Sequence, residues 1–539
     1  MALEEAHYAW SDLMNFSAQD VVLVIGAGIM GTGIAQVAAQ AGHRVFLFDT
    51  RPDAAASAKL GLGKTLESLI GKGKITAASA RNALALIEPI ETLTAAASAR
   101  IAIEAIVENL EAKRALFCDL EDSLSVDAVL ATNTSSISVT AIANGLRHPE
   151  RLVGMHFFNP VPLMRLVEVV SGLQTSPQVA DAIFELSRAW GKAPVHAKST
   201  PGFIVNRIAR PYYAETLALL QEQASTPLVL DACLRAVGFR MGPCELMDLI
   251  GHDTNFSVTQ SVYEANFFDK RFVPSLVQRE LVDAGLLGRK TGQGFYSYPR
   301  VAAAPEQIQV DPIERPDEVS VSGVGPLAEA LHRAAFTALA RFDLQPKRVV
   351  SNDWIGLQID GARLVMTDGR TAQDVAREFG LPDIAVFDRL LSWGSDIRPR
   401  PLGFAVNSDA GQMWKSQSAA WLKALGFEPL PLRDTPGLVV ARTIAMLVNE
   451  AADAVNQGVC TADGADIAMK LGVNYPSGPF EWLAGWSPQG VVQVLRSLDD
   501  AYRGERYRVS PWLRQAAASA AYAREVCSGL QRPEQKPTV

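Results

Sequence analysis

The stretch VVLVIGAGIMGTGIAQVAAQAGHRVFLFD, residues 21–49, decides the fold of the first part of this chain. It reads as an apolar strand, a glycine turn, a helix and a second apolar strand. Gly26, Gly28 and Gly31 form the pattern G-x-G-x-x-G, whose glycines allow a tight turn, close approach of a pyrophosphate and close packing of helix on strand. We therefore predict a Rossmann-type α/β domain that binds a dinucleotide.

The residues around the glycine turn indicate which dinucleotide binds. Ile29 and Met30 stand at the start of the helix, whose free N–H groups would face phosphate. Asp49 ends the second strand, where a carboxylate can accept hydrogen bonds from ribose hydroxyls and repel a 2′-phosphate. This favours NAD over NADP, although Arg51 tempers the preference. The competing interpretation is a glycine turn without a ligand.

The size and charge of the chain narrow the class of protein. A length of 539 residues predicts roughly three to four domains. The net charge of -8 comes without a basic block, which argues against a nucleic-acid or membrane partner. The five cysteines have neither disulfide nor metal-ligand spacing, so we expect reduced thiols, no metal site and a cytoplasmic protein.

A helical excursion, residues 52–93, follows the second strand and is more than a minimal dinucleotide fold requires. Lys64, Lys72 and Lys74 make it basic within an acidic protein, which suits a polyphosphorylated ligand. A solvated helix face explains these residues equally well.

Further polar residues stand where predicted parallel strands end, the edge at which such sheets bind ligands. Glu108 and Lys113 follow the strand at 101–107. Asn133 and Ser135 follow the next apolar run, and a serine there could hydrogen-bond a substrate oxygen. The alternative role of such a serine is to cap the next helix.

The segment RLVGMHFFNPVPLMRLVEVVS, residues 151–171, contains two strand-like runs joined by a proline turn. If the runs fold back on each other, His156 and Glu168 come side by side. A carboxylate that holds one imidazole nitrogen leaves the other free to act as a general base. A structural histidine and an exposed glutamate are the competing interpretation.

Beyond Pro201 the pattern becomes almost wholly helical, and Asn206 on the first turns could reach back to the cleft. After a proline-rich linker the chain repeats itself: DTPGLVVARTIAMLVNEA at 434 parallels STPGFIVNRIARPYYAET at 199, with Ala441 at the position of Asn206. We predict a Rossmann-type α/β domain and an all-α domain, followed by a degenerate second copy of both. The predicted boundaries are a tail (1–19), an NAD-binding domain (20–199), an all-α domain (200–299), a linker (300–318), a degenerate Rossmann-like domain (319–433), a second all-α domain (434–520) and a tail (521–539).

With these residues in place the chain resembles the 3-hydroxyacyl-CoA dehydrogenases. The resemblance runs through GAGIMGTG, NTSSIS, HFFNPVPLMRLVEVV, TPGFIVNR and GRKTGQGFYSY, and it covers residues 21–298 in register. The two-copy architecture is most similar to the long bacterial form associated with phenylacetate catabolism. That form implies 3-hydroxyadipyl-CoA as the substrate.

The resemblance implies a role for each site residue. His156 and Glu168 would be the catalytic pair, and Ser135 and Asn206 would contact the C3 oxygen of the substrate. Asp49, Glu108, Lys113 and Asn133 would lie at NAD, and the lysines of the excursion at coenzyme A. Family members pair through their helical domains, so the two copies here would form an internal pseudo-dimer, with a further homo-oligomer also compatible.

Three other functions remain open at this point. One is a short-chain 3-hydroxybutyryl-CoA dehydrogenase, and another is a gulonate dehydrogenase type of enzyme that acts on a free sugar acid. The third, from a different class, is a non-catalytic nucleotide-binding module. For a dicarboxylic substrate, Arg210 and Arg240 are candidate partners of the terminal carboxylate.

Overall fold

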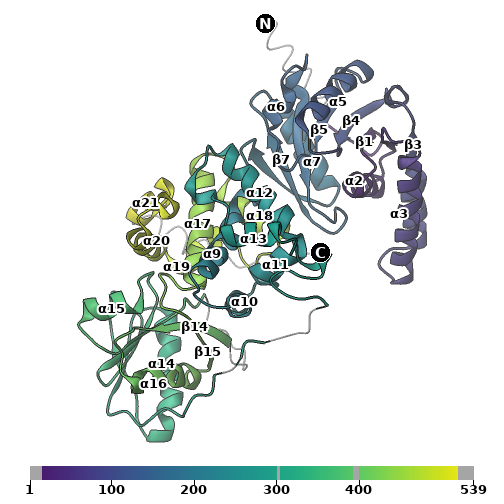
Figure 1. Ribbon diagram of the computed structural model, residues 1–539. Coiled ribbons are helices and arrows are strands. Elements are labelled where there is room, and N and C mark those ends of the chain that lie inside the picture. Colours follow the sequence, from purple (N-terminus) through teal and green to yellow (C-terminus); the bar gives the residue numbers. More distant parts are fainter. Residues whose placement is uncertain (1–14, 300–303, 307, 392–399, 520–539) are drawn as a thin grey trace, which may run out of the picture. The chain divides into compact units, whose positions relative to one another are not determined.

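The computed structural model describes residues 15–299, 304–306, 308–391 and 400–519 (Figure 1). The predicted tails therefore lie wholly or mostly outside the described residues. The chain divides into two compact units, residues 1–207 with 457–473, and residues 208–456 with 474–539. The first unit thus includes a short segment from the second copy.

The first unit is built on an eight-stranded sheet with the order β3-β2-β1-β4-β5-β6-β7-β8. Neighbours from β3 to β6 are parallel, β6 and β7 are antiparallel, and β8 is parallel to β7. Most of these strands are continuous apolar runs, as expected when helices cover both faces of a sheet. The strands are β1 (Val21–Ile25), β2 (Val45–Phe48), β3 (Ile87–Ile90), β4 (Ala99–Glu104), β5 (Val129–Thr132), β6 (Leu152–Phe157), β7 (Leu166–Ser171) and β8 (Ala193–Lys198).

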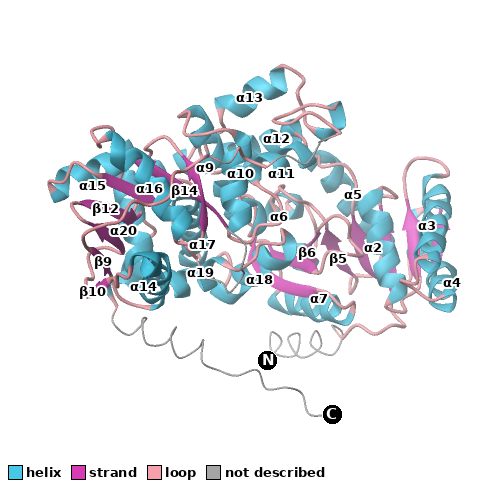
Figure 2. Ribbon diagram, turned by 90° about the horizontal axis from the view of Figure 1, so that it is seen from below, coloured by secondary structure: helices cyan, strands magenta, loops and turns pink. Residues whose placement is uncertain are grey.

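The helices of the first unit connect these strands and bury their apolar sides against the sheet. The predicted excursion forms a helical pair, α3 and α4, that lies beside β3 (Figure 2). The helices are α2 (Ile29–Gln40), α3 (Ala54–Gly71), α4 (Ala77–Leu86), α5 (Leu110–Ser123), α6 (Val139–Ala143), α7 (Pro177–Ala189), α8 (Val205–Ile208, ending at the border of the unit) and α18 (Ala462–Gly472), with 3-10 turns η1 (Leu93–Ala96) and η2 (Pro149–Arg151).

The second unit contains the degenerate Rossmann-like domain, a seven-stranded sheet with the order β10-β9-β11-β12-β13-β14-β15. This domain begins with a strand, a turn that contains Gly323 and Gly325, and a helix, but β11 is antiparallel to both neighbours. The elements are β9 (Val319–Ser322), α14 (Pro326–Leu339), η5 (Ala340–Phe342), β10 (Lys347–Val349), β11 (Gly356–Ile359), β12 (Ala362–Met366), α15 (Ala372–Phe379), β13 (Ile384–Phe387), β14 (Arg400–Val406), α16 (Gln412–Ala424) and β15 (Phe427–Pro431).

The remaining helices of the second unit come from both predicted all-α domains. From the first come α9 (Arg210–Gln221), α10 (Pro227–Ala236), α11 (Pro243–Ile250), α12 (His252–Ala265), η3 (Lys270–Phe272), α13 (Leu276–Asp283) and η4 (Arg289–Thr291). From the second come α17 (Val440–Asn456), α19 (Pro479–Trp486), α20 (Pro488–Tyr502), η6 (Glu505–Tyr507) and α21 (Pro511–Ala518). Helices α9 and α17 pack against each other, so the two copies meet inside this unit. Among the described helices, none has the length and apolar character needed to span a membrane.

Candidate active site

The glycine turn after β1 is shaped for a ligand. A side chain at Gly26 would clash with the backbone oxygen of Ala105 at 2.4 Å, and one at Gly31 would clash with the oxygen of Gly26 at 1.8 Å. Gly28 in contrast faces open space, with no atom within 4 Å of the position that a Cβ would take, and it begins α2 without a side-chain cap. Open space before uncapped helical N–H groups fits a pyrophosphate.

Ile29 and Met30 occupy the first two positions of α2. Ile29 is 78% exposed and Met30 is half-buried. A large exposed apolar side chain at a helix N-terminus, such as that of Ile29, can cover a bound cofactor.

Asp49 closes the glycine turn from the end of β2. One carboxylate oxygen accepts the N–H of Ala27 at 2.8 Å, and the guanidinium of Arg51 donates to both oxygens at 3.0 Å. The hydrogen bond from Arg51 is the main reason why the pKa of Asp49 falls to about 2. Asp49 is therefore an anion at every physiological pH, as the predicted preference for NAD requires.

Two carboxylates and a lysine form a cluster at the carboxyl ends of β4 and β5. The buried ammonium of Lys113 donates to Glu104 at 2.6 Å and lies 3.2 Å from Glu108. Burial alone would raise the pKa of Glu108, but hydrogen bonds from Thr134 and Ser135 and the charge of Lys113 lower it to about 2. Glu108 thus remains charged beside the predicted cofactor edge.

Asn133 and Ser135 lie in the turn after β5. The side-chain oxygen of Asn133 accepts the N–H of Phe157 at 2.8 Å, which ties this turn to the end of β6. The hydroxyl of Ser135 donates to Glu108 at 3.3 Å, and its N–H donates to the same oxygen at 2.9 Å. Ser138, and not Ser135, caps the next helix, α6, so the serine next to the strand is left for other contacts.

His156 and Glu168 lie opposite each other on the antiparallel strands β6 and β7. The Nδ1 atom of His156 is 2.5 Å from Oε2 of Glu168, and both side chains are buried. The other carboxylate oxygen accepts the N–H groups of Ile204 and Val205, each at 3.0 Å. This arrangement fixes the carboxylate and leaves Nε2 of the imidazole available for a substrate proton.

Asn206 connects this pair to the cofactor side. It follows directly the two residues whose N–H groups hold Glu168, and its amide nitrogen donates to the backbone oxygen of Ser135 at 3.3 Å. The structure therefore brings His156, Glu168, Ser135 and Asn206 into one connected site beside the glycine turn.

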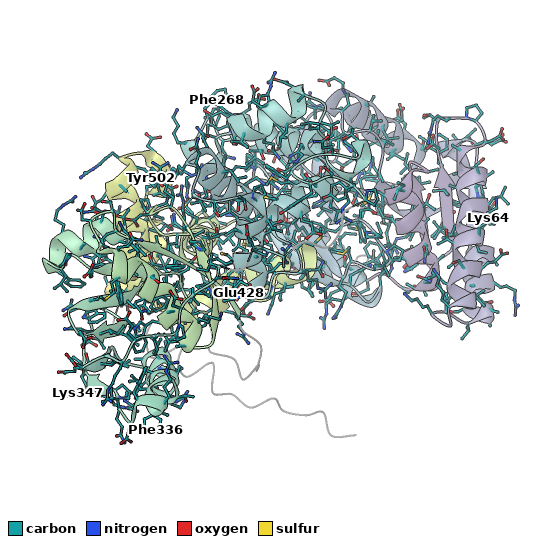
Figure 3. All side chains as sticks on the ribbon, turned by 60° about the horizontal axis from the view of Figure 1, so that its bottom comes forward. Lys64, Phe268, Phe336, Lys347, Glu428 and Tyr502 are labelled. Carbon is teal, nitrogen blue, oxygen red and sulfur yellow. The ribbon has the colours of Figure 1, made fainter. Side chains whose placement is uncertain are left out.

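The predicted coenzyme A lysines lie apart from this connected group. Lys64 is exposed on α3 (Figure 3). Lys72 and Lys74 are exposed at the turn that ends this helix. In the described ranges, no group of three or more His, Cys, Asp or Glu side chains is arranged to hold a metal ion.

Sequence reasoning missed Glu104 and Thr134. Glu104 is fully buried at the end of an apolar strand, where its oxygens accept from Lys113 and, at 2.6 Å, from the hydroxyl of Thr132. Thr134 donates to Glu108 at 2.7 Å. The available signal was a carboxylate inside the apolar run IAIEAIV, because an unpaired charge is too costly to bury.

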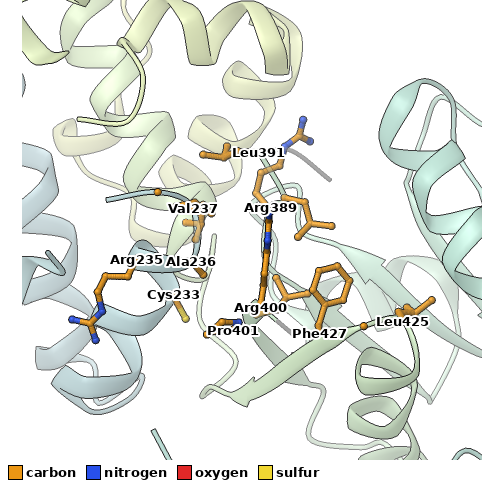
Figure 4. A pocket seen from close by; sticks show the side chains of 16 residues that line it. Cys233, Arg235, Ala236, Val237, Arg389, Leu391, Arg400, Pro401, Leu425 and Phe427 are labelled. Carbon is orange, nitrogen blue, oxygen red and sulfur yellow. The ribbon is translucent and has the colours of Figure 1, made fainter. Parts of the chain in front are cut away.

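The second unit has a cavity of about 400 Å³ lined by Cys233, Arg389, Arg400 and Phe427, among others (Figure 4). The side chain of Arg235 turns away from the other lining residues. The described residues that line this cavity include no histidine–carboxylate pair.

Comparisons with known proteins identify the family of the chain. Residues 21–200 match the family described as 3-hydroxyacyl-CoA dehydrogenase, NAD binding domain, and residues 202–298 and 437–530 match the C-terminal domain of the same family. Residues 364–436 match the 3-hydroxybutyryl-CoA dehydrogenase reduced Rossmann-fold domain.

Individual relatives cover either the whole chain or its first half. The 3-hydroxyadipyl-CoA dehydrogenase of Escherichia coli is 42% identical over 92% of this chain and 97% of its own length. The mitochondrial hydroxyacyl-coenzyme A dehydrogenase of Sus scrofa is 39% identical over 51% of this chain and 90% of its own length. A crystal structure named 3-hydroxybutyryl-CoA dehydrogenase from Escherichia coli superposes with a TM-score of 0.83 and 40% identity, over 93% of this chain and 99% of that one.

These matches confirm the predicted fold class, the family resemblance and NAD as the cofactor. When bound, NAD accepts the hydride from the alcohol carbon. The chain belongs to the 3-hydroxyacyl-CoA dehydrogenase family and is an NAD-dependent oxidoreductase.

Proposed function

We propose that this enzyme oxidises (S)-3-hydroxyadipyl-CoA to the 3-oxoacyl-CoA. The observation that carries the reaction is the buried contact of 2.5 Å between His156 Nδ1 and Glu168 Oε2, next to Ser135 and Asn206. The choice of substrate rests on the relative of that name, which matches both copies of this chain.

In this proposal, His156 removes the proton from the C3 hydroxyl through Nε2, and NAD, when bound, would accept the hydride from C3. Glu168 stabilises the imidazolium that forms, since its negative charge lies at the opposite ring nitrogen. Ser135 and Asn206 hold the substrate oxygen, and as donors they stabilise negative charge on it in the reverse direction. For this, the Ser135 hydroxyl must exchange its contact with Glu108 for one with substrate.

A shorter substrate is the second candidate. The crystal structure that covers nearly the whole chain bears the name 3-hydroxybutyryl-CoA dehydrogenase. Three further points belong to this proposal. The two copies form an internal pseudo-dimer, which the packing of α9 on α17 supports. Lys64, Lys72 and Lys74 bind coenzyme A, for which their exposure is the support. The enzyme is cytoplasmic, in keeping with the four cysteines that are free thiols among the described residues.

One assay tests the proposal. NADH oxidation is followed with 3-oxoadipyl-CoA, acetoacetyl-CoA and a free 3-oxo sugar acid in parallel. We expect kcat/KM to be highest for 3-oxoadipyl-CoA, and a higher value for acetoacetyl-CoA would assign the enzyme to the short chain. Turnover with the sugar acid alone, or with none of the three, would contradict an acyl-CoA dehydrogenase.

A first variant tests the chemistry. His156→Gln removes the base but keeps a side chain of similar reach, so we expect kcat to fall by roughly 10²–10⁴-fold while NADH binding is preserved. NADH affinity is measured by fluorescence titration and kcat by absorbance. Unimpaired turnover in this variant would overturn the assignment.

A further inference from the structure

The first unit is completed by a segment of the second copy, Gln457–Val473. The backbone N–H of Lys198, at the end of β8, donates to the oxygen of Val459 at 2.9 Å. Helix α18 then packs on β7 and β8, and β7 is the strand that carries Glu168. Residues of the second copy that lie 250 or more positions after their partners in the sequence thus support the candidate active site.

The same arrangement occurs a second time, with the roles of the copies exchanged. The N–H of Arg433 donates to the oxygen of Ala224 at 2.9 Å in the second unit, and these positions correspond to Lys198 and Val459. Arg442 likewise donates to Glu222, as Arg207 donates to Gln457 at 2.8 Å in the first unit. Each copy therefore lends this segment to the Rossmann-like domain of the other.

In the first unit the lent segment reaches the residues that hold Glu168. A Cβ atom on Gly472 would lie 2.6 Å from the side chain of Leu166 and 3.0 Å from that of Val205. Leu166 is on the same strand as Glu168, and Val205 donates its N–H to that carboxylate. Because Gly472 is buried without room for one more carbon, it sets the distance between these two elements.

A second contact lies next to Asn206. The guanidinium of Arg207 donates to the side chain of Gln457, and this hydrogen bond holds the first turn after Val205 in place. Cys460 of the same segment is close enough to Glu168 that burial and the negative charge of that carboxylate raise its pKa to about 12. The segment thus approaches both the carboxylate of Glu168 and the turn of chain that carries Asn206.

We propose that Gln457–Val473 positions the acid–base machinery, with Gly472 and Gln457 as positioning residues that act through Val205 and Arg207. This inference rests on the proposed roles of His156 and Glu168. Proton transfer and hydride transfer tolerate errors of only a fraction of an ångström in the supporting groups, so a distant segment can control kcat without touching substrate. The second copy is then a part of the active site, and not only a packing surface.

The test uses Gly472→Ala in the full chain. We expect kcat per NADH-binding site to fall about ten-fold, with the Kd for NADH unchanged, because Leu166 or Val205 must move. General loss of folding would instead remove NADH sites and leave kcat per site unchanged. The matched control is Gly485→Ala in α19, where no atom lies within 4 Å of the new carbon, so kcat stays as in the wild type.

A second pair of variants covers the case in which Gly472→Ala does not fold. Gln457→Ala removes the contact to Arg207 and should lower kcat about three-fold or more, whereas Gln457→Glu keeps an acceptor for Arg207 and should retain wild-type kcat. Values of kcat within a factor of two of wild type in Gly472→Ala and Gln457→Ala would overturn the inference. If His156→Gln abolishes turnover in the same series, the proposed function survives that failure.

Discussion

The two oxygens of the Glu168 carboxylate contact two different elements, β6 and the start of α8. Oε2 contacts the imidazole of His156 and Oε1 accepts the N–H groups of Ile204 and Val205. An amide in its place could accept on only one side, because its nitrogen is a donor. The position of the histidine and the start of α8 are therefore fixed by one side chain, which explains why a carboxylic acid side chain, and not an amide, stands at this position.

The preference for NAD over NADP is predicted to depend on Asp49. In Asp49→Asn the charge that repels a 2′-phosphate is gone, and Arg51 loses the ion pair that now occupies it. We expect the ratio of kcat/KM for NAD to that for NADP to fall roughly 10–30-fold, which corresponds to about 1–2 kcal/mol. Steady-state kinetics with both cofactors measure the ratio. An unchanged ratio would mean that Asp49 only orders the glycine turn through Ala27.

The contribution of Asp388 to stability is predicted to depend on pH. It is fully buried, it accepts the N–H groups of Val439, Val440 and Ala441, and burial raises its pKa to about 6. Since this pKa is higher folded than unfolded, the folded state binds more protons between about pH 4 and 6. Its contribution to stability is greatest below this window, and about 3 kcal/mol is lost as the pH rises through it.

Hydrogen exchange checks this at the helix start itself. After correction for intrinsic rates, protection of the amides of Val439 to Ala441 should fall between about pH 4 and 6 in the wild type. In Asp388→Asn the protection differs in level, but the step with pH should be absent. The same step in the variant would assign it to another group.

At the scale of elements, the turn between β6 and β7 connects the strand of His156 to helix α2. The ammonium of Lys192 holds this turn by donating to the backbone oxygens of Val161 and Met164, at 2.5 and 2.9 Å. Burial lowers the pKa of Lys192 to about 8. On the other side, Val161 packs on Gly33 in α2, where a new Cβ would lie only 2.9 Å from Val161 Cβ.

Gly33→Ala is therefore expected to affect both NAD binding and turnover. The added methyl group displaces either α2 or the turn, so we predict a rise of several-fold in the KM for NAD together with a lower kcat. Gly61→Ala in α3 is the control, because nothing lies within 4 Å of its new carbon and alanine favours a helix by about 0.5–1 kcal/mol. Equal kinetics in the two variants would show that the turn and α2 are not coupled.

For the whole molecule, local pattern predicted the site but not what supports it. Residues 151–171 indicated the His156–Glu168 contact because two apolar runs and a proline turn lie within one hairpin. Glu104 was missed because a buried carboxylate with a lysine partner leaves only a break in an apolar run. The packing of Gly472 against Leu166 could not be inferred at all, since the partners are about 300 positions apart and the contact depends on tertiary structure.

Arg442 is one of the buried cations that join the two copies in the second unit, and Arg271, which contacts Glu450 and Asp453 of α17, is another. Arg442 donates to Glu215 at 2.8 Å and Glu222 at 3.0 Å, from α17 to α9, and it is 1% exposed in its side chain. Arg442→Met leaves Glu215 with Arg506 as its remaining arginine partner among these contacts, so the cost comes from an under-compensated buried charge. Breaking such a pair costs about 3–5 kcal/mol, which lowers the apparent Tm of this unit by roughly 5–10 °C.

Thermal unfolding followed by circular dichroism measures the shift, and Arg377→Met is the matched control. Arg377 is 73% exposed and pairs with Asp374 at 3.2 Å, so its loss should change stability by no more than about 0.5 kcal/mol. Because α9 and α17 belong to different copies, a large effect at Arg442 alone would support the internal pseudo-dimer. Equal shifts would show that Arg442 is dispensable to their pairing.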